Sequence, residues 1–559
     1  MRDTGAIYEE WLAAVSDEEL KRELSSMDKS AIDDAFFADL SFGTGGLRGV
    51  MAAGTNRMNV YTVAKATRGL GDYIVSEFPE NKSVAIGYDS RNNSERFAKL
   101  AAVILADMGI KVYIWSELLP TPMLSYAVRE LGCSAGIMLT ASHNPAKYNG
   151  YKVYRSDGCQ ITEEAAAMIS ERIAAVSDFG NIPERSFDAL LESGIIEFIP
   201  ERIYEAFVAE VMANSMLKSD TGADKAIKII YSPLNGTGRR PVLDVLARQG
   251  FTGITVVREQ ELPDGNFPTC PYPNPEIPEA MSLGLEYMAR EGAELLLATD
   301  PDCDRVGVGV KTPSGESILL TGNEIGLLLL EFICRRRTES GNMPENAVMV
   351  KTIVTTDLAE RIATRYGVKC ANVLTGFKYI GEYIGALEAQ GREKDYILGF
   401  EESCGYLTAG YVRDKDGVLA AMLIAELAAY YKSCGKTLYE ALSEIYETYG
   451  YCKNSLRSYA FEGTAGFAKM QCIMQRLREK IDTVGGLAVE RVLDYKGGIE
   501  GLPPSDVLKF CLFGGSSIVV RPSGTEPKLK AYFCANSRGA AAAEELTKRI
   551  ADGIEEFIK

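Results

Sequence analysis

The sequence has a single histidine, His143, among 559 residues. This scarcity excludes metal sites built from two or three imidazoles, including the H-E-x-x-H metalloproteases. It also argues against a serine-protease triad, because His143 directly follows Ser142 and adjacent residues of an extended segment point to opposite sides. Any proton transfer by an imidazole must therefore involve His143 alone.

The twelve cysteines contain no C-x-x-C pair, and the two nearest, Cys434 and Cys452, are eighteen positions apart. A zinc ribbon or a thioredoxin-like redox motif is therefore not expected. Cys133 and Cys334 lie in apolar runs, where a thiol behaves as a small hydrophobic group. This pattern favours a reducing cytoplasm over secretion.

Long hydrophobic runs are missing as well. The most apolar stretches, such as residues 325–334, are far shorter than the ~20 residues that span a bilayer. Residues 1–24 lack the apolar region of a signal peptide and predict an amphipathic helix. We therefore expect a cytoplasmic, soluble protein with no membrane partner.

Basic residues are too few to suggest nucleic-acid binding: 60 Lys and Arg against 77 Asp and Glu give a net charge of −17. The 46% hydrophobic and 25% charged residues are typical of a globular protein. At roughly 100–200 residues per domain, the length predicts about three to five domains.

Short apolar runs alternate with helical patterns in three successive units, as in α/β domains. The first unit is predicted to have strands at residues 84–88, 111–115 and 135–139, with helices at 94–108 and 123–131. The second has strands at 227–231, 254–257 and 294–298, with helices at 240–248 and 279–291. The third has strands at 347–350, 369–373 and 396–400, with helices at 357–366 and 379–388.

After about residue 448 the pattern changes to strands at 492–495, 507–513, 517–520 and 530–535, followed by a helix at 540–558. We predict an α/β fold with three mixed, mostly parallel α/β domains and a C-terminal α+β domain, because parallel strands need crossover helices. The expected boundaries are 1–205, 206–322, 323–447 and 448–559. Ligands of such sheets bind outside the carboxyl ends of the strands, so polar loops after strands are the candidate sites.

The first such loop is residues 140–145, T-A-S-H-N-P. A serine hydroxyl at the mouth of a strand makes Ser142 a candidate nucleophile. A helix N-cap or an Asx turn would use the same residue types. The sequence has no G-x-S-x-G elbow, so an α/β-hydrolase is not favoured, and phosphoryl acceptance suits Ser142 better.

The second loop is D-P-D-C-D-R, with carboxylates at Asp300, Asp302 and Asp304. Three alternating carboxylates can converge on one hard cation, and oxygen-only ligation favours Mg²⁺ or Mn²⁺. A solvated acidic turn is the simpler alternative, and an aspartyl-phosphate phosphatase also remains open. An EF-hand is excluded, because Arg305 stands where the sixth-position glycine is needed.

Three further segments carry polar groups. Glu401 and Ser403 in G-F-E-E-S-C-G could bind sugar hydroxyls or form a surface turn. Residues 521–528, R-P-S-G-T-E-P-K, resemble a phosphate cradle in composition, with a hairpin connection as the alternative. Arg48 lies in G-T-G-G-L-R-G, which is neither a Walker loop nor a dinucleotide fingerprint; a flexible turn is favoured, although Arg48 could grip a phosphate.

Taken together and in this order, the loops resemble those of the α-D-phosphohexomutase superfamily, the phosphoglucomutases and phosphomannomutases, over nearly the whole chain. T-A-S-H-N-P is similar to the phosphoserine loop, D-P-D-C-D-R to the metal loop, E-E-S-C-G to the sugar-recognition loop and R-P-S-G-T-E-P-K to the phosphate-binding loop. Residues 41–49 and the helical N-terminal extension resemble the branch of bacterial α-phosphoglucomutases, phosphopentomutase and glucose-1,6-bisphosphate synthase. The resemblance implies four domains around a central cleft.

The resemblance also implies roles for individual residues of this phosphoprotein. The implied catalytic residues are Ser142, which carries the phosphoryl group, and Lys152; His143, next to Ser142, and Arg48 are added as candidates from their own positions in the sequence. The implied ligands of one Mg²⁺ per chain are Ser142, through its phosphoryl group, Asp300, Asp302 and Asp304. The implied substrate-binding residues are Thr375, Gly376, Lys378, Glu401, Ser403, Lys415 and Arg305. The implied phosphate-binding residues are Arg521, Ser523, Gly524, Thr525 and Lys528.

The implied activity, in glucose metabolism, is that of an isomerase. It interconverts α-D-glucose 1-phosphate and glucose 6-phosphate through a phosphoserine and a hexose 1,6-bisphosphate, with glucose 1,6-bisphosphate as activator. Two departures from the animal muscle type, D-P-D-C-D-R for D-G-D-G-D-R and Phe400 for Gly, place the chain in the other branch.

Several alternatives share the expected sugar-phosphate ligands. A phosphopentomutase, a phosphomannomutase and a glucose-1,6-bisphosphate synthase would use the same phosphoserine chemistry. A phosphatase would release inorganic phosphate, and a non-catalytic sensor would not need the nucleophile Ser142. The sequence does not distinguish a monomer from a homodimer.

Overall fold

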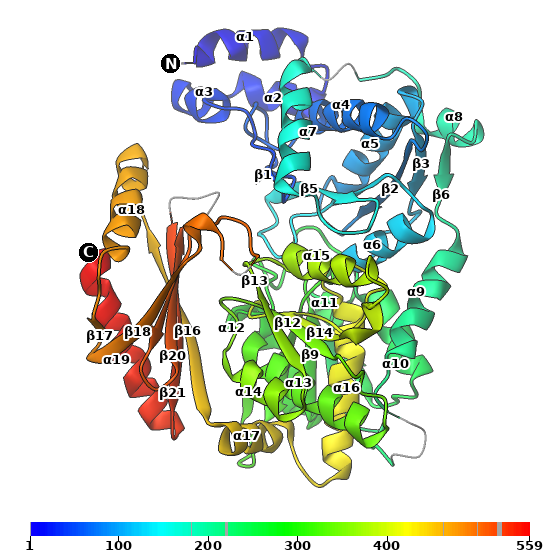
Figure 1. Ribbon diagram of the computed structural model, residues 1–559. Coiled ribbons are helices and arrows are strands. Elements are labelled where there is room, and N and C mark those ends of the chain that lie inside the picture. The colour runs from blue at the N-terminus through cyan, green and yellow to red at the C-terminus, as the bar shows by residue number, and fades with distance from the viewer. Residues whose placement is uncertain (1, 180–181, 218–221, 462, 500, 523–527) are drawn as a thin grey trace. The chain divides into compact units, whose positions relative to one another are not determined.

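The computed structural model describes residues 2–179, 182–217, 222–461, 463–499, 501–522 and 528–559. The chain forms two compact units, and Figure 1 labels most of their helices and many of their strands. Unit 1 comprises Met1–Leu320, Gly381–Glu393 and Gly405–Gly435. Unit 2 comprises Thr321–Ile380, Lys394–Cys404 and Lys436–Lys559.

The first sheet of unit 1 has six strands in the order β1-β5-β4-β2-β3-β6. Its strands are β1 (Leu47–Val50), β2 (Ser83–Tyr88), β3 (Lys111–Ile114), β4 (Ala135–Leu139), β5 (Tyr148–Arg155) and β6 (Ile196–Phe198). Its helices are α4 (Val60–Glu77), α5 (Ser94–Asp107), α6 (Thr121–Glu130), α7 (Glu163–Ala175), α8 (Phe187–Glu192) and α9 (Glu201–Ala213). β2 is parallel to β3 and β4 and every residue of β2 and β4 is buried, as expected for a sheet covered on both faces.

The antiparallel edge of this sheet was not predicted from the sequence. β5 runs antiparallel to both β4 and β1. Its sequence, Y-N-G-Y-K-V-Y-R, is too polar to stand out as a strand, yet it is mostly buried. This edge carries Lys152 on β5 and Arg48 on β1.

The N-terminal extension forms three helices, α1 (Thr4–Ala14), α2 (Glu18–Ser25) and α3 (Lys29–Phe36). The expectation of one helix over residues 1–24 was therefore wrong. Asp17 ends the continuity, because its side chain accepts hydrogen bonds from the backbone of Glu19 and Leu20 and caps α2. Trp11 of α1 packs edge-on against Tyr61 of α4, so the extension shares the core of the first sheet.

The second sheet of unit 1 has the order β11-β10-β9-β7-β8. Its strands are β7 (Ile229–Ser232), β8 (Ile254–Val256), β9 (Leu295–Thr299), β10 (Val306–Lys311) and β11 (Ser317–Leu320). Its helices are α10 (Arg239–Arg248), α11 (Arg258–Glu261), α12 (Pro278–Glu291) and α16 (Gly417–Ser433). α16 follows the third predicted unit in sequence, but it packs against α10 and β9. β9 and β10 form an antiparallel pair, so residues 300–305 are a tight connection between them.

Unit 2 contains the parallel pairs of β12 (Val348–Thr352) with β13 (Lys369–Val373) and with β14 (Tyr396–Glu401). Unit 2 also contains α13 (Gly322–Glu339), α14 (Leu358–Arg365) and α17 (Leu438–Tyr449). In the same stretch of sequence, β15 (Gly405–Leu407) and most of α15 (Phe377–Glu388) belong to unit 1, and η1 (Glu393–Asp395) begins at the last residue of a unit 1 segment. The apolar residues 325–334 lie in α13 and are buried in the protein. Among the described residues no single helix has the length and apolarity to cross a membrane; α16 and α17 pass that test only as a pair bent by 86°.

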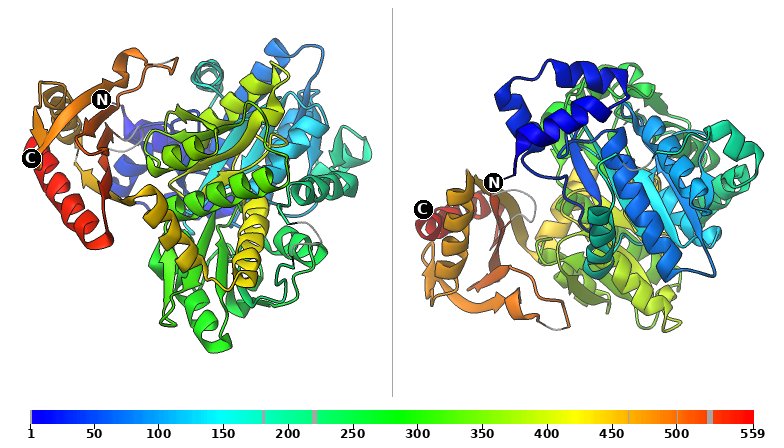
Figure 2. Two further views of the ribbon diagram at one scale, coloured as in Figure 1. Left: turned by 60° about the horizontal axis from the view of Figure 1, so that its bottom comes forward. Right: turned by 90° about the horizontal axis from the view of Figure 1, so that it is seen from above.

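The C-terminal sheet has the order β16-β21-β20-β19-β18-β17. Its elements are β16 (Tyr451–Ala460), α18 (Gly463–Leu477), β17 (Thr483–Val484), β18 (Leu487–Asp494), η2 (Tyr495–Gly497), β19 (Leu508–Leu512), β20 (Ser516–Pro522), β21 (Lys528–Ser537) and α19 (Ala540–Ile558). Ile518 and Val520 join the core under α18 and α19, which cover one face of the sheet (Figure 2). The intervening Val519 packs on the other face with Ile353 and Leu374. β16 and α18 were not predicted.

Candidate active site

Ser142 lies three residues after the end of β4 and is buried. Its φ is 52°, a left-handed conformation that costs a non-glycine residue roughly 1–3 kcal/mol and persists only when the surroundings enforce it. The backbone N–H of Ser142 donates to Thr140 Oγ1 at 2.8 Å, and the Ser142 hydroxyl donates to Asp300 Oδ2 at 2.9 Å. The turn thus aims the hydroxyl at the loop after β9.

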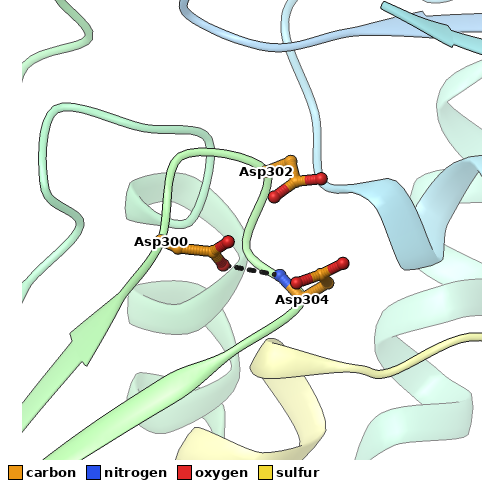
Figure 3. Close-up of side chains that lie close together, drawn as sticks. All are labelled: Asp300, Asp302 and Asp304. Atoms are coloured by element: carbon orange, nitrogen blue, oxygen red, sulfur yellow. Dashed lines mark hydrogen bonds between the residues drawn. The ribbon is translucent and has the colours of Figure 1, made fainter. Parts of the chain in front are cut away.

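Asp300, Asp302 and Asp304 converge in that loop (Figure 3), each at most 2% exposed. One carboxylate oxygen from each lies within 4.8 Å of the others. Asp300 Oδ1 accepts hydrogen bonds from the backbone N–H groups of Asp304 and Arg305 at 3.1 and 3.0 Å, which folds the loop back on itself. The predicted convergence of the three side chains is confirmed.

The three carboxylates are buried side by side and are not fully hydrogen-bonded by the described residues. Burial and the adjacent Asp302 and Asp304 raise the pKa of Asp300 well above its ordinary value. Asp302 Oδ1 and Asp304 Oδ1 are buried and accept no hydrogen bond from any described residue; the Arg305 Nε atom lies 3.8 Å from Asp304 Oδ1. Buried carboxylate oxygens without donors are costly, so this all-oxygen donor set fits a divalent cation.

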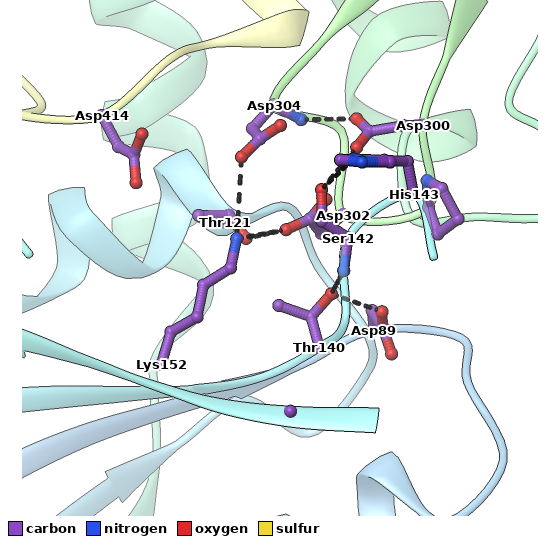
Figure 4. A network of polar contacts seen from close by, with 12 residues as sticks. Asp89, Thr121, Thr140, Ser142, His143, Lys152, Asp300, Asp302, Asp304 and Asp414 are labelled. Atoms are coloured by element: carbon purple, nitrogen blue, oxygen red, sulfur yellow. Dashed lines mark hydrogen bonds and ion pairs between the residues drawn. The ribbon is translucent and has the colours of Figure 1, made fainter. Parts of the chain in front are cut away.

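Two buried lysines, Lys152 (Figure 4) and Lys415, flank the carboxylates. Lys152 Nζ lies 2.8 Å from Asp302 Oδ2 and 3.7 Å from Asp304 Oδ2. Lys415 Nζ lies 3.1 Å from Asp304 Oδ2 and 3.1 Å from Asp414 Oδ1. Burial acts to lower the pKa of Lys152, but Asp302 and Asp304 outweigh it and the pKa is raised. Both lysines are positioned to meet a second anion beside the cluster.

His143, Arg305 and Arg48 lie in the same region. His143 Nδ1 is 3.2 Å from Ser142 Oγ. Burial, and then the positive charges of Arg305 and Arg48, lower the pKa of His143 well below its ordinary value. Arg305 forms an ion pair with Glu276, and Arg48 is exposed on β1 opposite Gly150. Unit 1 therefore brings together all the predicted site residues that it contains.

The predicted sugar-binding residues of unit 2 follow the carboxyl ends of β13 and β14. Thr375 comes two residues after β13, and its Oγ1 is buried without a hydrogen bond to a described residue. Gly376 has a φ of 120°, and Lys378 Nζ lies 4.6 Å from the centre of the Tyr379 ring. Glu401 ends β14 and accepts a hydrogen bond from Ser403 Oγ at 2.8 Å.

The predicted phosphate-binding residues lie at the β20–β21 connection. Arg521 is in β20 opposite Lys530, and Lys528 begins β21. Ser523, Gly524 and Thr525 lie outside the described residues. Arg521 and Lys528 therefore lie near the ends of two paired antiparallel strands.

Sequence reasoning missed several buried polar residues around this site. Thr121 Oγ1 donates to Asp302 Oδ2 at 2.9 Å, and Tyr154 donates to Asp414 at 2.9 Å. Asp89 and Arg91 support the Ser142 loop. Asp89 and Arg91 follow β2 directly, so the rule that ligands lie outside the carboxyl ends of strands could have found them.

Four protein-family models match successive regions of the chain. The models for α/β/α domains I, II and III of phosphoglucomutase/phosphomannomutase match residues 39–178, 205–315 and 321–449. The model for the C-terminal domain matches residues 471–553. The chain belongs to the phosphoglucomutase/phosphomannomutase family. The predicted superfamily and four-domain α/β architecture are confirmed, and family membership makes the protein a phosphohexomutase, an isomerase.

Curated relatives cover almost the whole chain. A phosphoglucomutase of Staphylococcus saprophyticus is 36% identical over 535 residues, which is 94% of this chain and 95% of the relative. A phosphoglucomutase of Staphylococcus haemolyticus is 36% identical over 521 residues, 90% of this chain and 92% of the relative. The open form of Paramecium parafusin, a phosphoglucomutase, has the same fold, with a TM-score of 0.69 at 17% identity over 93% of this chain and 95% of that one.

Proposed function

We propose that the protein is a phosphoglucomutase that interconverts α-D-glucose 1-phosphate and glucose 6-phosphate. The observation that carries this proposal is the Ser142 hydroxyl, held 2.9 Å from Asp300 at the edge of a buried three-carboxylate cluster. Two lysines beside the cluster can bind the substrate's phosphate oxygens. The staphylococcal relatives with this activity in their names support the choice of glucose.

The metal site fits one Mg²⁺ per chain. Asp300, Asp302 and Asp304 would hold it through carboxylate oxygens, two of which have no hydrogen-bond donor among the described residues. A phosphoryl oxygen on Ser142 would be a further ligand. When bound, the cation offsets negative charge on the phosphoryl group, which is the main electrostatic requirement of phosphoryl transfer.

Side chains around the cluster would carry out phosphoryl transfer, proton transfer and substrate binding. The phosphoryl group leaves phosphorylated Ser142 Oγ as a new P–O bond forms to the substrate hydroxyl, whose proton passes by way of His143, which its lowered pKa keeps neutral, to Ser142 Oγ. Lys152, whose pKa is raised, stays a cation beside the transferring group. The resulting glucose 1,6-bisphosphate turns over, returns its other phosphoryl group to Ser142, and acts as activator when added. Arg305, Lys415 and Arg48 would bind the substrate near the reacting phosphate.

The residues of unit 2 would recognise the sugar and the non-reacting phosphate. Hydroxyl groups of the sugar would bind Glu401, Ser403 and Lys378, with Thr375 and Gly376 beside them. The second phosphate would bind Arg521 and Lys528 together with Ser523, Gly524 and Thr525. The same arrangement would serve a phosphopentomutase, a phosphomannomutase or a glucose-1,6-bisphosphate synthase. The cytoplasmic location and the absence of nucleic-acid and membrane partners stay predictions.

A coupled assay of glucose 6-phosphate formation tests the proposal. Ser142→Ala should abolish conversion of glucose 1-phosphate, while Ser282→Ala, at an exposed serine of α12, should retain normal turnover. Turnover should also be measured with ribose 1-phosphate and with mannose 1-phosphate as substrates, each with and without a catalytic amount of glucose 1,6-bisphosphate. Near-normal turnover by Ser142→Ala would overturn the proposal, and release of one inorganic phosphate per substrate lost would identify a phosphatase.

A further inference from the structure

Arg91 is a buried arginine whose guanidinium binds one loop through backbone carbonyl groups. It lies in Y-D-S-R, directly after β2, and is 3% exposed. Its Nη1 donates to the carbonyl oxygens of Pro145 and Tyr148 at 3.0 and 3.1 Å. Its Nη2 donates to the carbonyl oxygens of Ser142 and Asn144. One side chain therefore ties together both ends of the segment that carries the nucleophile.

Asp89 holds the other side of the same turn. Its Oδ2 accepts a hydrogen bond from Thr140 Oγ1 at 2.6 Å, and Thr140 Oγ1 in turn accepts from the backbone N–H of Ser142 at 2.8 Å (Figure 4). Asp89 also pairs with Arg91 Nε at 3.3 Å, and both side chains are completely buried. The N–H and the C=O of Ser142 are thus both fixed by one buried ion pair.

These contacts, which we call the clasp, are the hydrogen bonds from the Arg91 guanidinium to the four carbonyl oxygens together with its ion pair to Asp89. They require the planar, multi-donor guanidinium group of an arginine. Four carbonyl oxygens in different directions need several rigid, coplanar donors, whereas lysine offers one compact ammonium group. The guanidinium also stacks over Phe267, with its central carbon 5.1 Å from the ring centre, which fixes its plane. Burial and these backbone contacts leave Arg91 no role as a substrate ligand.

We propose that Arg91, through its ion pair with Asp89, is the positioning residue that holds Ser142 in its left-handed conformation, so that the hydroxyl points at the metal loop during phosphoryl transfer. This inference rests on the proposed function for its kinetic consequence. Without the clasp the turn can relax to ordinary backbone angles, and a displacement of about 1 Å at a reacting atom can cost about 100-fold in rate.

Arg91→Lys tests the proposal kinetically. We expect kcat to fall about 100-fold while the KM for the sugar phosphate changes less than about threefold, because Arg91 touches the loop and not the substrate. Thr140→Val, which removes only the Asp89–Thr140–Ser142 link, should lower kcat about tenfold, and Thr140→Ser should restore it. Arg96→Met, at an exposed arginine of α5, is the matched control and should leave both constants unchanged.

Hydrogen exchange of the peptide covering residues 139–149 gives a readout that needs no substrate. Exchange should accelerate in Arg91→Lys and Thr140→Val and stay at the wild-type rate in Arg96→Met. This readout separates the two proposals: an enzyme that turns over another sugar phosphate, or none, would contradict the proposed function while the exchange data still decide the role of Arg91. Wild-type exchange in Arg91→Lys, or a kinetic defect confined to KM, would overturn the positioning role.

Discussion

Two clusters of buried charge, one in each unit, differ in how completely their carboxylate oxygens are hydrogen-bonded. In unit 1, three carboxylates face Lys152 and Lys415, and two buried carboxylate oxygens have no hydrogen-bond donor among the described residues. In unit 2, the Asp357 carboxylate accepts hydrogen bonds from Lys351, Lys509 and Ser517 at 3.2, 2.8 and 2.7 Å, so both of its oxygens are paired.

The pKa values of Asp357 and Asp300 are shifted in opposite directions. Burial acts to raise the pKa of Asp357, but Lys351 and Lys509 outweigh it and hold that pKa well below its ordinary value. For Asp300 burial and like charges act in the same direction, and its pKa is raised. The fully paired cluster around Asp357 joins β12 and α14 to β19 and β20. The incompletely paired cluster of unit 1 marks a place for a ligand.

Asp302→Asn should give the largest effect on activity, because it removes a cation ligand from the three-carboxylate cluster of unit 1. We expect kcat to fall about 100- to 1000-fold, and half-maximal activity to need more Mg²⁺. In EDTA its melting temperature should fall below that of the wild type: burial acts to raise the pKa of Asp302, but the ion pair with Lys152 outweighs it and holds that pKa well below its ordinary value, so the ionised carboxylate stabilises the fold. Activity titrated with Mg²⁺ and thermal unfolding in EDTA measure both effects, with Asp107→Asn at an exposed position of α5 as control. Full activity at wild-type Mg²⁺ levels would remove Asp302 from the cation site.

Glu426 is a third kind of buried carboxylate, because the hydrogen-bond donors to its two oxygens are neutral groups and not lysines. It accepts from Ser215 Oγ and from the backbone N–H of Met216, and burial raises its pKa from 4.5 to about 7. The folded state binds this proton more tightly than the unfolded state, so the stabilisation is complete below pH 4.5 and is lost as the pH rises through about 7.

The shift corresponds to about 3 kcal/mol. Glu426→Gln should remove that decline, so the stability difference between wild type and variant should change between pH 5 and pH 8 in urea unfolding. Parallel pH profiles for the two proteins would show that Glu426 does not titrate in this range.

Asp357→Asn should give a smaller loss of stability, because the Asp357 side chain is 20% exposed. We expect unfolding to become easier by about 1–2 kcal/mol, because Lys351 and Lys509 lose their shared partner, and kcat at low temperature to stay near normal. Glu360→Gln, which also faces Lys351 but is 43% exposed, should cost less than about 0.5 kcal/mol. Denaturant unfolding and turnover measured on the same samples test this. An activity loss without a stability loss would mean that Asp357 serves catalysis.

The sequence predicted the elements that follow simple periodic rules. The strands at 135–139 and 369–373 match β4 and β13 residue for residue. The first is a short apolar run flanked by polar turns, whereas the second, K-C-A-N-V, is mixed in polarity. Ser142 and the three aspartates could be predicted because each directly follows a short apolar strand. The metal loop is short enough that sequence spacing alone brings its carboxylates together.

What could not be predicted depends on tertiary contacts. β5 lacks an apolar run because it presents Lys152 to the metal loop, so its pattern does not resemble a buried strand. α16 packs on a sheet formed more than 100 residues earlier, and no local pattern indicates that partner. Arg91 is an ordinary charged residue in sequence, and its role is visible only when the carbonyl groups of residues 142–148 surround it.

The most direct test of the central claim is the intact mass of the protein after incubation with glucose 1,6-bisphosphate and Mg²⁺. The account predicts a gain of about 80 Da, one phosphoryl group, located on Ser142 and absent from Ser142→Ala. It further predicts that added glucose 1-phosphate is converted to glucose 6-phosphate with almost no inorganic phosphate released. A protein that gains no mass, or that gains it on another residue while turnover proceeds, would contradict the account.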